Sequence, residues 1–310
     1  MIVTVTLNPA VDRTLWVRSL APGDTNRVLR SVMDPGGKGI NMSLVLRECG
    51  VQTTALGFIA GHTGQFIKTY LENRGIATSF VEVKGETRIN IAVEDAGGGP
   101  PTTLHEPGPE VGMEDLRQLW DRIRPLLKQA QFIAFGGSLP PGVPNDVYAT
   151  LIRNCQDNGV RAILDADGTP LMAGLNAKPY LVKPNRAEAE RLLGRSIRSI
   201  EDAASGALEL VQRGVSFAVI SMGVKGAVGA TSEEVWRVRP PVVTSKSTVG
   251  SGDSMLAGIA AALAKGAGVG DALRLGAAAG AATAASPDAG LCTQAEIQAI
   301  YPQVHLERLR

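Results

Sequence analysis

The sequence predicts an α/β protein built around a mostly parallel sheet. Beyond residue 112, short apolar segments typical of buried strands alternate with segments of helical periodicity. The 310 residues suffice for one large domain with a small insertion, and 44% hydrophobic with 20% charged residues is typical of a globular chain. Because we find no internal repeat and no linker, we expect a single domain over residues 1–310.

The N-terminal segment predicts three short strands. Residues 2–7 are rich in β-branched side chains, and the Asn-Pro turn that follows is expected to place Asp12 just past the strand end. Residues 14–17 and 25–32 predict two more strands, separated by the turn signal Pro22-Gly23-Asp24.

A change of pattern marks the region before residue 112. A helix ending at Gly50, a strand near 53–57 and a helix over 63–74 come first. Short β-like pieces separated by turn residues then follow at 79–83, 88–94 and 102–106. We assign these pieces, with the hairpin before them, to a small sheet inserted beside the main one and drawn from about 13–33 and 79–106.

The remaining elements alternate regularly. They are a helix over 113–129, a strand at 132–135, a helix over 145–158, strands at 162–165 and 180–182, helices over 186–193 and 201–213, a strand at 217–221, a hairpin within 227–238, Ala-rich helices over 253–265 and 269–285, and a last helix from Thr293.

Composition excludes several classes of function. Lys plus Arg number 31 and Asp plus Glu 30, so no global field favours nucleic acid or a membrane surface. The sequence contains no run of about 18 apolar residues, so no membrane-spanning helix is expected. The three cysteines lack metal-like spacing, and the chain begins directly with a strand, so we expect a reducing cytoplasm and no signal peptide. The P-loop, GxGxxG, HExxH and GxSxG patterns are absent.

A glycine-rich loop precedes the first Ala-rich helix. Gly250, Ser251 and Gly252 lead into the helix N-terminus, where free N–H groups and the helix dipole favour an anion that glycines let come close. Asp253 follows at once. An anion cradle beside a carboxylate is the minimum apparatus for moving a phosphoryl group onto a hydroxyl. The alternative is an Asp that only stabilises the first helical turn.

Other polar clusters follow predicted strands. A second glycine-rich loop, with Gly37, Lys38 and Asn41, enters a helix, and further clusters lie at 136–142, 183–188 and 221–226. A tight turn alone explains any one of these clusters. In open parallel sheets, however, ligands bind at the carboxyl ends of the strands, so their joint position at one edge indicates a site.

These motifs together resemble a known family. Residues 36–41 and 247–254, with Lys183-Pro184-Asn185-x-x-Glu188 between them, are similar in order and separation to the signatures of the ribokinase (PfkB) carbohydrate kinases, over essentially the whole chain. Residues 6–12 and 137–142, with the Leu-Val-Lys-Pro-Asn run, resemble the phosphosugar branch, which includes 1-phosphofructokinases, tagatose-6-phosphate kinases and the minor 6-phosphofructokinase.

The resemblance implies a ribokinase-like fold with a small β-sheet lid, and a role for each matched residue. Asp253 would be the catalytic base and residues 250–252 the anion hole. Asn185 and Glu188 would organise Mg²⁺ and phosphate oxygens through water. The implied ATP-site residues are Lys183, Asn185, Ser221, Gly223, Gly226, Thr248, Gly250 and Gly252. The implied contacts to the sugar are Asp12, Gly37 and Asn41.

A phosphorylated sugar needs fixed cations at its far end. Lys38, Arg88 and Arg27 are the candidates, with the hydroxyl of Ser138. Both arginines fall in the expected lid, whose closure would exclude water. For Arg27 a solvated strand charge is the alternative.

The residues favour fructose 1-phosphate as substrate, since Thr87-Arg88-Ile89-Asn90 looks most like 1-phosphofructokinases, while Gly85-Glu86-Thr87-Arg88 is also close to tagatose-6-phosphate kinases. Fructose 6-phosphate stays open, as does a non-catalytic sugar-phosphate sensor. The family also suggests a homodimer through the lid and a monovalent-cation site near Ser247, Val249 and the loop after Ala285.

Overall fold

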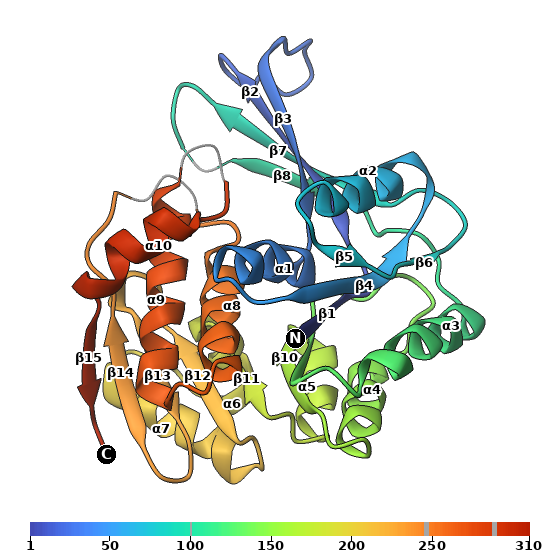
Figure 1. The fold of residues 1–310 in the computed structure, drawn as a ribbon. Coiled ribbons are helices and arrows are strands. Elements are labelled where there is room, and N and C mark those ends of the chain that lie inside the picture. The colour runs from blue at the N-terminus through green and yellow to red at the C-terminus, as the bar shows by residue number, and fades with distance from the viewer. Residues whose placement is uncertain (100, 245–247, 287–289) are drawn as a thin grey trace.

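The computed structural model describes residues 1–99, 101–244, 248–286 and 290–310. Within them, an 11-stranded sheet runs in the order β15-β14-β13-β12-β11-β10-β9-β1-β4-β5, with β6 also paired to β4 (Figure 1). All neighbouring strands between β12 and the β5/β6 edge pair in parallel. On the other side of β12, the strands β13, β14 and β15 extend the sheet through antiparallel pairs. The predicted α/β class with a mostly parallel sheet is confirmed.

The strands of this main sheet are β1 (Ile2–Thr6), β4 (Thr53–Ile59), β5 (Ala77–Thr78), β6 (Val81–Glu82), β9 (Phe132–Gly136), β10 (Arg161–Asp165), β11 (Leu181–Val182), β12 (Phe217–Ser221), β13 (Ala227–Ala230), β14 (Val235–Arg239) and β15 (His305–Arg308). The helices are α1 (Lys38–Glu48), α2 (Gly61–Glu72), α3 (Met113–Ile123), α4 (Val147–Gln156), α5 (Gly168–Leu175), α6 (Arg186–Leu193), α7 (Ile200–Gln212), α8 (Ser251–Ala264), α9 (Val269–Ala285) and α10 (Gln294–Ile300).

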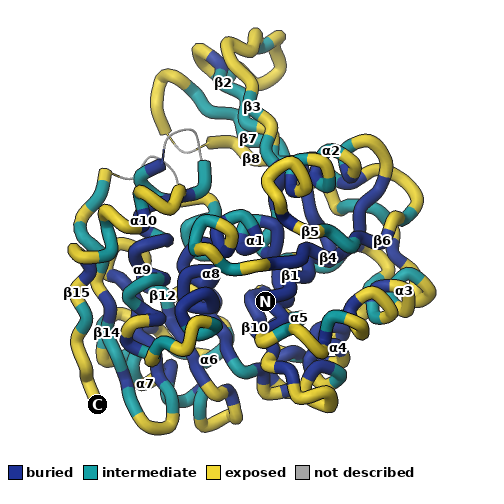
Figure 2. Tube along the Cα trace, in the orientation of Figure 1, coloured by how far each residue is buried: buried dark blue, intermediate teal, exposed yellow. Residues whose placement is uncertain are grey.

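Helices cover both faces of the main sheet, which is why its strands are apolar on both sides. Within β9, Ile133 and Phe135 pack into the core under α3, α4 and α7, whereas Phe132 and Ala134 pack under α1, α8 and α9. Figure 2 shows the central strands and α8 buried and the tip of the second sheet exposed.

The second sheet, called the lid below, has the order β3-β2-β7-β8. Its strands are β2 (Ala10–Val17), β3 (Val28–Gly36), β7 (Arg88–Asp95) and β8 (Thr102–His105). The β2–β7 pair is parallel and the other two pairs are antiparallel. The lid projects beyond the carboxyl ends of the main-sheet strands, above α1 (Figure 1).

Three details differ from the sequence-based expectations. The segment at 79–83, assigned to the small sheet, instead supplies β6, which extends the main sheet through β4. Asp12 lies inside β2 rather than in a turn, because β2 begins at Ala10 and pairs along its whole length with β7. The helix expected over 113–129 ends at Ile123 and continues as a single 3₁₀ turn containing Pro125, which cannot donate a helical hydrogen bond.

No helix in the described ranges is long and apolar enough to cross a membrane.

Candidate active site

The N-terminus of α8 is built to approach an anion. Gly250 precedes the helix with φ of +73°, a left-handed conformation that side-chain-bearing residues rarely adopt. A Cβ there would lie 2.7 Å from Leu291 Cδ2 and 3.7 Å from Asn41 Nδ2. Glycine at this position therefore satisfies both the backbone conformation and the close packing, and leaves the first N–H groups of α8 without a side chain in front of them.

Asp253 lies in the first turn of α8 and is held from α1. The Asn41 side chain donates a hydrogen bond of 2.8 Å from Nδ2 to Asp253 Oδ2. Burial raises the pKa of Asp253 to about 6 and the charge of Asp165 adds to it, while Lys38, Lys183 and the Asn41 hydrogen bond act in the opposite direction. The carboxyl is thus ionised at pH 7, and its pKa lies close enough to 7 for it to accept a proton from a reacting group.

Two lysines and a buried carboxylate lie beside this group. Lys38 Nζ is 2.7 Å from Asp165 Oδ1, and Lys183 Nζ is 3.7 Å from Asp165 Oδ2. Lys183 also reaches residues 250–252, called the anion loop below after the role expected of them, since a Cβ at Gly252 would be 3.3 Å from Lys183 Nζ. Burial alone would lower the pKa of Lys38, but the carboxylates of Asp165, Asp253 and Glu188 outweigh it and raise the pKa. The first of the two cations is therefore held in its charged form.

This arrangement differs from the expected one for Lys38. From the sequence, Lys38 was expected to bind the far phosphate of the sugar together with Arg88 and Ser138. Its ammonium instead pairs with Asp165, beside Asp253 and Lys183, because Lys38 is the first residue of α1 and its side chain crosses the end of β9. The structure thus places Lys38 next to Asp165 and Asp253.

The lid supplies a polar wall opposite α8. The register places Asp12 beside Asn90 of β7, and Asn90 Nδ2 donates to Asp12 Oδ1 at 2.8 Å. A Cβ at Gly36 would collide with the Asp12 carboxylate, so glycine there keeps room for it. Burial raises the pKa of Asp12, and the Asn90 hydrogen bond and the charge of Arg88 offset part of that rise.

Arg88 and Ser138 meet at one end of this wall. Arg88 Nη2 donates to the backbone oxygen of Asn8 at 3.1 Å and to Ser138 Oγ at 3.3 Å. Asn8 Nδ2 also contacts Ser138 Oγ at 3.4 Å. Lid and main sheet therefore join here through a guanidinium and a hydroxyl, the pair that the sequence assigned to a phosphate group.

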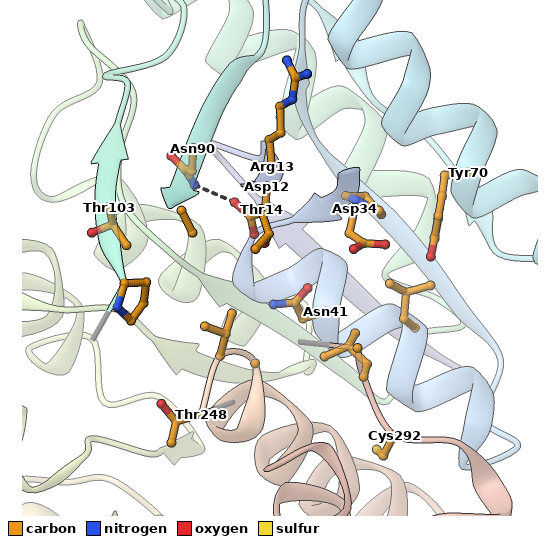
Figure 3. Close-up of a pocket in the computed structure, with 18 of the residues that line it drawn as sticks. Asp12, Arg13, Thr14, Asp34, Asn41, Tyr70, Asn90, Thr103, Thr248 and Cys292 are labelled. Carbon is orange, nitrogen blue, oxygen red and sulfur yellow. Dashed lines mark hydrogen bonds between the residues drawn. The ribbon is translucent and has the colours of Figure 1, made fainter. Parts of the chain in front are cut away.

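A cleft of about 820 Å³ separates the lid from α1 and the start of α8. Figure 3 shows the Asp12–Asn90 hydrogen bond on the lid side of the cleft, Asn41 facing it, and Asp34 next to Tyr70. The expected residues Asp12, Asn41, Thr248 and Gly250 line this cleft. Its volume is in the range of small-molecule sites.

The expected nucleotide side has the Asn185–Glu188 pair at its centre. Asn185 caps α6: its Oδ1 accepts from the Glu188 N–H at 2.9 Å, and its own N–H donates to Glu188 Oε2 at 2.8 Å. Asn185 also bridges to Ser221 at the end of β12. Gly223 and Gly226 follow with positive φ, and a Cβ at Gly226 would collide with the Val238 carbonyl oxygen. Four of the expected ATP-site residues thus lie close together at the ends of β11 and β12: Asn185, Ser221, Gly223 and Gly226.

Arg27 does not join the site within this chain. It lies in the exposed turn between β2 and β3, at the far end of the lid hairpin, and does not line the cleft. The reason is the length of the hairpin: Asp12 and Asp34 pair near its base, and the strands run on to Val17 and Val28 before the turn. Ser247, expected near a monovalent cation, lies outside the described residues.

Asp34 and Asp165 are two acidic residues near the site that were not predicted from the sequence. Asp34 pairs with Asp12 across β2 and β3 and lines the cleft, and burial together with the Asp12 carboxylate raises the pKa of Asp34. Asp165 ends β10 beside Gly136. A signal for Asp165 was available, because it is the last residue of a predicted parallel strand at the edge where the other polar clusters lie. No such signal pointed to Asp34.

Comparison with known families matches residues 3–296 to the pfkB family of carbohydrate kinases. A 1-phosphofructokinase of Bacillus subtilis is 36% identical over 265 residues, 86% of each chain. A 1-phosphofructokinase of Xanthomonas campestris is 39% identical over 266 residues, 84% of this chain and 83% of its own.

The fold has a similarly close match among solved structures. Phosphofructokinase-2 from Escherichia coli in complex with potassium superposes with a TM-score of 0.92 at 34% identity, over 97% of this chain and 98% of that one. The E. coli protein has also been solved as a tetrameric inhibited form.

Proposed function

Because the chain belongs to the pfkB family of carbohydrate kinases, we propose that it transfers the γ-phosphoryl group of ATP to a ketohexose phosphate, converting fructose 1-phosphate to fructose 1,6-bisphosphate. The observation that carries this proposal is the position of Asp253. It lies in the first turn of α8, next to two lysines, and accepts a hydrogen bond from Asn41, which lines the cleft together with Gly250.

In the proposed reaction, Asp253 accepts the proton of the sugar hydroxyl as that oxygen bonds to the γ-phosphorus. The bond from the γ-phosphorus to the oxygen bridging it to the β-phosphate breaks, and ADP leaves with that electron pair. Residues 250–252 at the start of α8 would stabilise the charge that develops, with Lys183 beside Gly252. A base with a pKa of about 6 predicts that kcat falls as the pH drops through about 6, since protonated Asp253 cannot accept the proton.

The residues on the expected nucleotide side fit a magnesium ion only if water molecules lie between the ion and the Glu188 carboxylate. No group of three or more His, Cys, Asp or Glu side chains in the described residues forms a metal cage. Glu188 is 8% exposed, and its Oε2 is used by the helix cap. Mg²⁺ commonly keeps several waters and takes one or two protein oxygens plus phosphates, so Asn185 and Glu188 would hold its hydration shell. When bound, the ion would neutralise polyphosphate charge.

The sugar phosphate is proposed to span the cleft. Asp12 and Asn41 face each other across it and would accept and donate hydrogen bonds to hydroxyl groups (Figure 3). Arg88, with Ser138, would bind the existing phosphate, because a guanidinium anchored to the backbone at Asn8 presents fixed donors to an anion. The reacting hydroxyl would then point at Asp253.

The reaction is tested by ADP release with each of three substrates: fructose 1-phosphate, tagatose 6-phosphate and fructose 6-phosphate. We expect the highest kcat/KM with fructose 1-phosphate. A higher value with tagatose 6-phosphate or fructose 6-phosphate would reassign the substrate within the family. Binding of all three without ADP release would instead favour a sugar-phosphate sensor and overturn the kinase proposal.

A homodimer through the lid is part of the proposal. By strand alternation and register, one lid face carries Leu15, Val93 and Ile91 together with Met33, 40% exposed, and Leu104, 59% exposed. Arg13 and Ser31 share this face, but exposed apolar side chains grouped in this way are typical of protein–protein contacts. The lid-face substitution Leu104→Asp is expected to convert a dimer to a monomer in sedimentation equilibrium. Thr103→Asp, on the opposite face of β8, is the matched control, and a monomeric wild type would contradict this assembly.

The proposal also includes a cytoplasmic location and a monovalent-cation site. The cysteines Cys49, Cys155 and Cys292 are all free, which is compatible with a reducing cytoplasm where ATP is supplied. A monovalent-cation site is supported by the potassium complex of the E. coli relative. Its expected position involves Ser247 and the loop after Ala285, of which Ser247 and residues 287–289 lie outside the described part of the chain.

A further inference from the structure

Asp165 is a buried carboxylate for which the proposed reaction has no direct use. Its side chain is 2% exposed at the end of β10. Oδ1 bonds to Lys38, whereas Oδ2 is fully buried and has no hydrogen-bond partner among the described residues. Burying a charge is costly unless it is paired, so a carboxylate with one free oxygen in this position calls for a reason.

The surrounding backbone is arranged to let Lys38 reach this carboxylate. Asp165 pairs with Gly136 of β9, and a Cβ at Gly136 would lie 2.9 Å from the Asp165 backbone oxygen and 3.2 Å from Lys38 Cβ. The missing side chain leaves the path that the Lys38 stem takes over the end of the strand. A larger residue at 136 would have to displace either the lysine or the neighbouring strand.

The second lysine approaches from the other side. Lys183 follows β11, the neighbour of β10, and its Nζ is 3.7 Å from the free Oδ2 of Asp165. The same ammonium faces Gly252 of the anion loop. Lys183 thus lies between the loop and Asp165, with which it forms an ion pair, and its ammonium can also donate to a phosphoryl oxygen near Gly252.

We propose that Asp165 is a positioning residue that holds the ammonium groups of Lys38 and Lys183 beside Asp253. This inference rests on the proposed phosphoryl transfer. Two ammonium groups confined without an anion would repel each other and turn toward Asp253, pairing with the base instead of the phosphate. Asp165 supplies the negative charge that pairs with both ammonium groups, so that neither lysine needs to pair with Asp253.

The charges around Asp253 give the proposal a distinctive signature. Facing Asp253 are Lys38 from α1, Lys183 after β11 and Asp165 from β10, with Asn41 as the neutral donor. The Asp165 charge raises the pKa of Asp253 and the two lysines lower it. Removing the Asp165 charge therefore lowers the pKa of Asp253, which a loss of local packing alone has no reason to do.

The test is Asp165→Asn, which keeps the shape and removes the charge. We expect kcat to fall about 10–100-fold with a smaller change in KM for the phosphosugar. We also expect the acid limb of the kcat profile to move to lower pH by about half a pH unit or more. Asp167→Asn is the matched control, because Asp167 is exposed, pairs with Arg191 and caps α5, a role that Asn also fills.

A second readout does not depend on turnover. Carbon-13 NMR of the Asp carboxyls, with the Asp253 signal assigned by Asp253→Asn, measures the pKa of Asp253 directly. It should fall in Asp165→Asn and stay at the wild-type value in Asp167→Asn. If Asp165→Asn does not fold, Asp165→Ser removes the same charge with a smaller polar group. An unchanged Asp253 pKa, or wild-type kcat, in the folded variant would overturn the proposal.

The two proposals fail in different ways. A wild-type protein that releases no ADP with any of the three sugar phosphates counts against the proposed function, while the NMR titration still decides the effect of Asp165 on Asp253. Turnover by the wild type together with an unmoved limb in Asp165→Asn counts against the positioning role alone.

Discussion

Asp253→Asn is expected to lower kcat by about 10²–10⁴-fold while the dissociation constant for ATP stays within a few-fold of wild type. The Asn side chain keeps the size of Asp253 and its contact with Asn41, but cannot accept the proton of the attacking hydroxyl. The anion loop is untouched, so nucleotide binding has no reason to fail. Steady-state ADP release and calorimetric titration with ATP measure the two quantities.

The pH profile adds an independent check. The limb expected near pH 6 in the wild type would come from Asp253, so it should be absent from the residual activity of Asp253→Asn. Asp271→Asn is the matched control, because Asp271 lies exposed in the first turn of the next helix, α9, and should leave kcat unchanged. Near wild-type turnover in Asp253→Asn, or a retained limb, would mean that another group is the base.

Arg88→Ala is expected to raise KM for the phosphosugar about 10–100-fold and to change KM for ATP by less than about three-fold. The range corresponds to the loss of hydrogen bonds from a charged donor, worth about 1.5–3 kcal/mol. Arg88 is the first residue of the lid strand β7 and donates to the backbone oxygen of Asn8 and to Ser138 Oγ, contacts that involve none of the expected ATP-site residues. Initial rates with one substrate varied at saturating levels of the other measure both constants.

The control for Arg88 comes from the same sheet. Arg18 follows β2, is exposed, and should give wild-type constants when replaced by Ala. Equal effects of Arg88→Ala on both KM values would show that Arg88 closes the lid as a whole rather than binding one phosphate. The variant's thermal midpoint should be compared as well, because Arg88 also joins the lid to the main sheet through Ser138.

Local sequence patterns predicted several features of the candidate site. The glycines at 36–37 and 250–252, each ahead of a helical repeat, predicted two helix N-termini, and the structure has α1 and α8 there. Polar residues at the ends of 132–135, 180–182 and 217–221 predicted one shared edge, and Gly136, Lys183 and Ser221 lie along consecutive or near-consecutive strands. Such features depend on residues close in sequence, which is why they could be predicted.

Contacts between distant segments could not be predicted in this way. The pairing of Lys38 with Asp165 joins residues 127 positions apart and depends on the order in which β9 and β10 lie in the sheet. The placement of 79–83 depended on which strand offered a free edge, and β4 offered one. Arg27 lies away from the cleft of its own chain because the length of the β2–β3 hairpin is set by its pairing register.

The amino-acid sequence by itself determined the α/β class, the two glycine-led helix starts and the chemistry of the residues at the strand ends, since each follows from periodicity or from what glycine, lysine and carboxylate side chains can do locally. Only the tertiary structure decided which charges meet. Packing across strands and helices places Lys38 on Asp165 instead of at the far phosphate, brings Asn41 to Asp253, and sets the burial that moves the pKa of Asp253 to about 6.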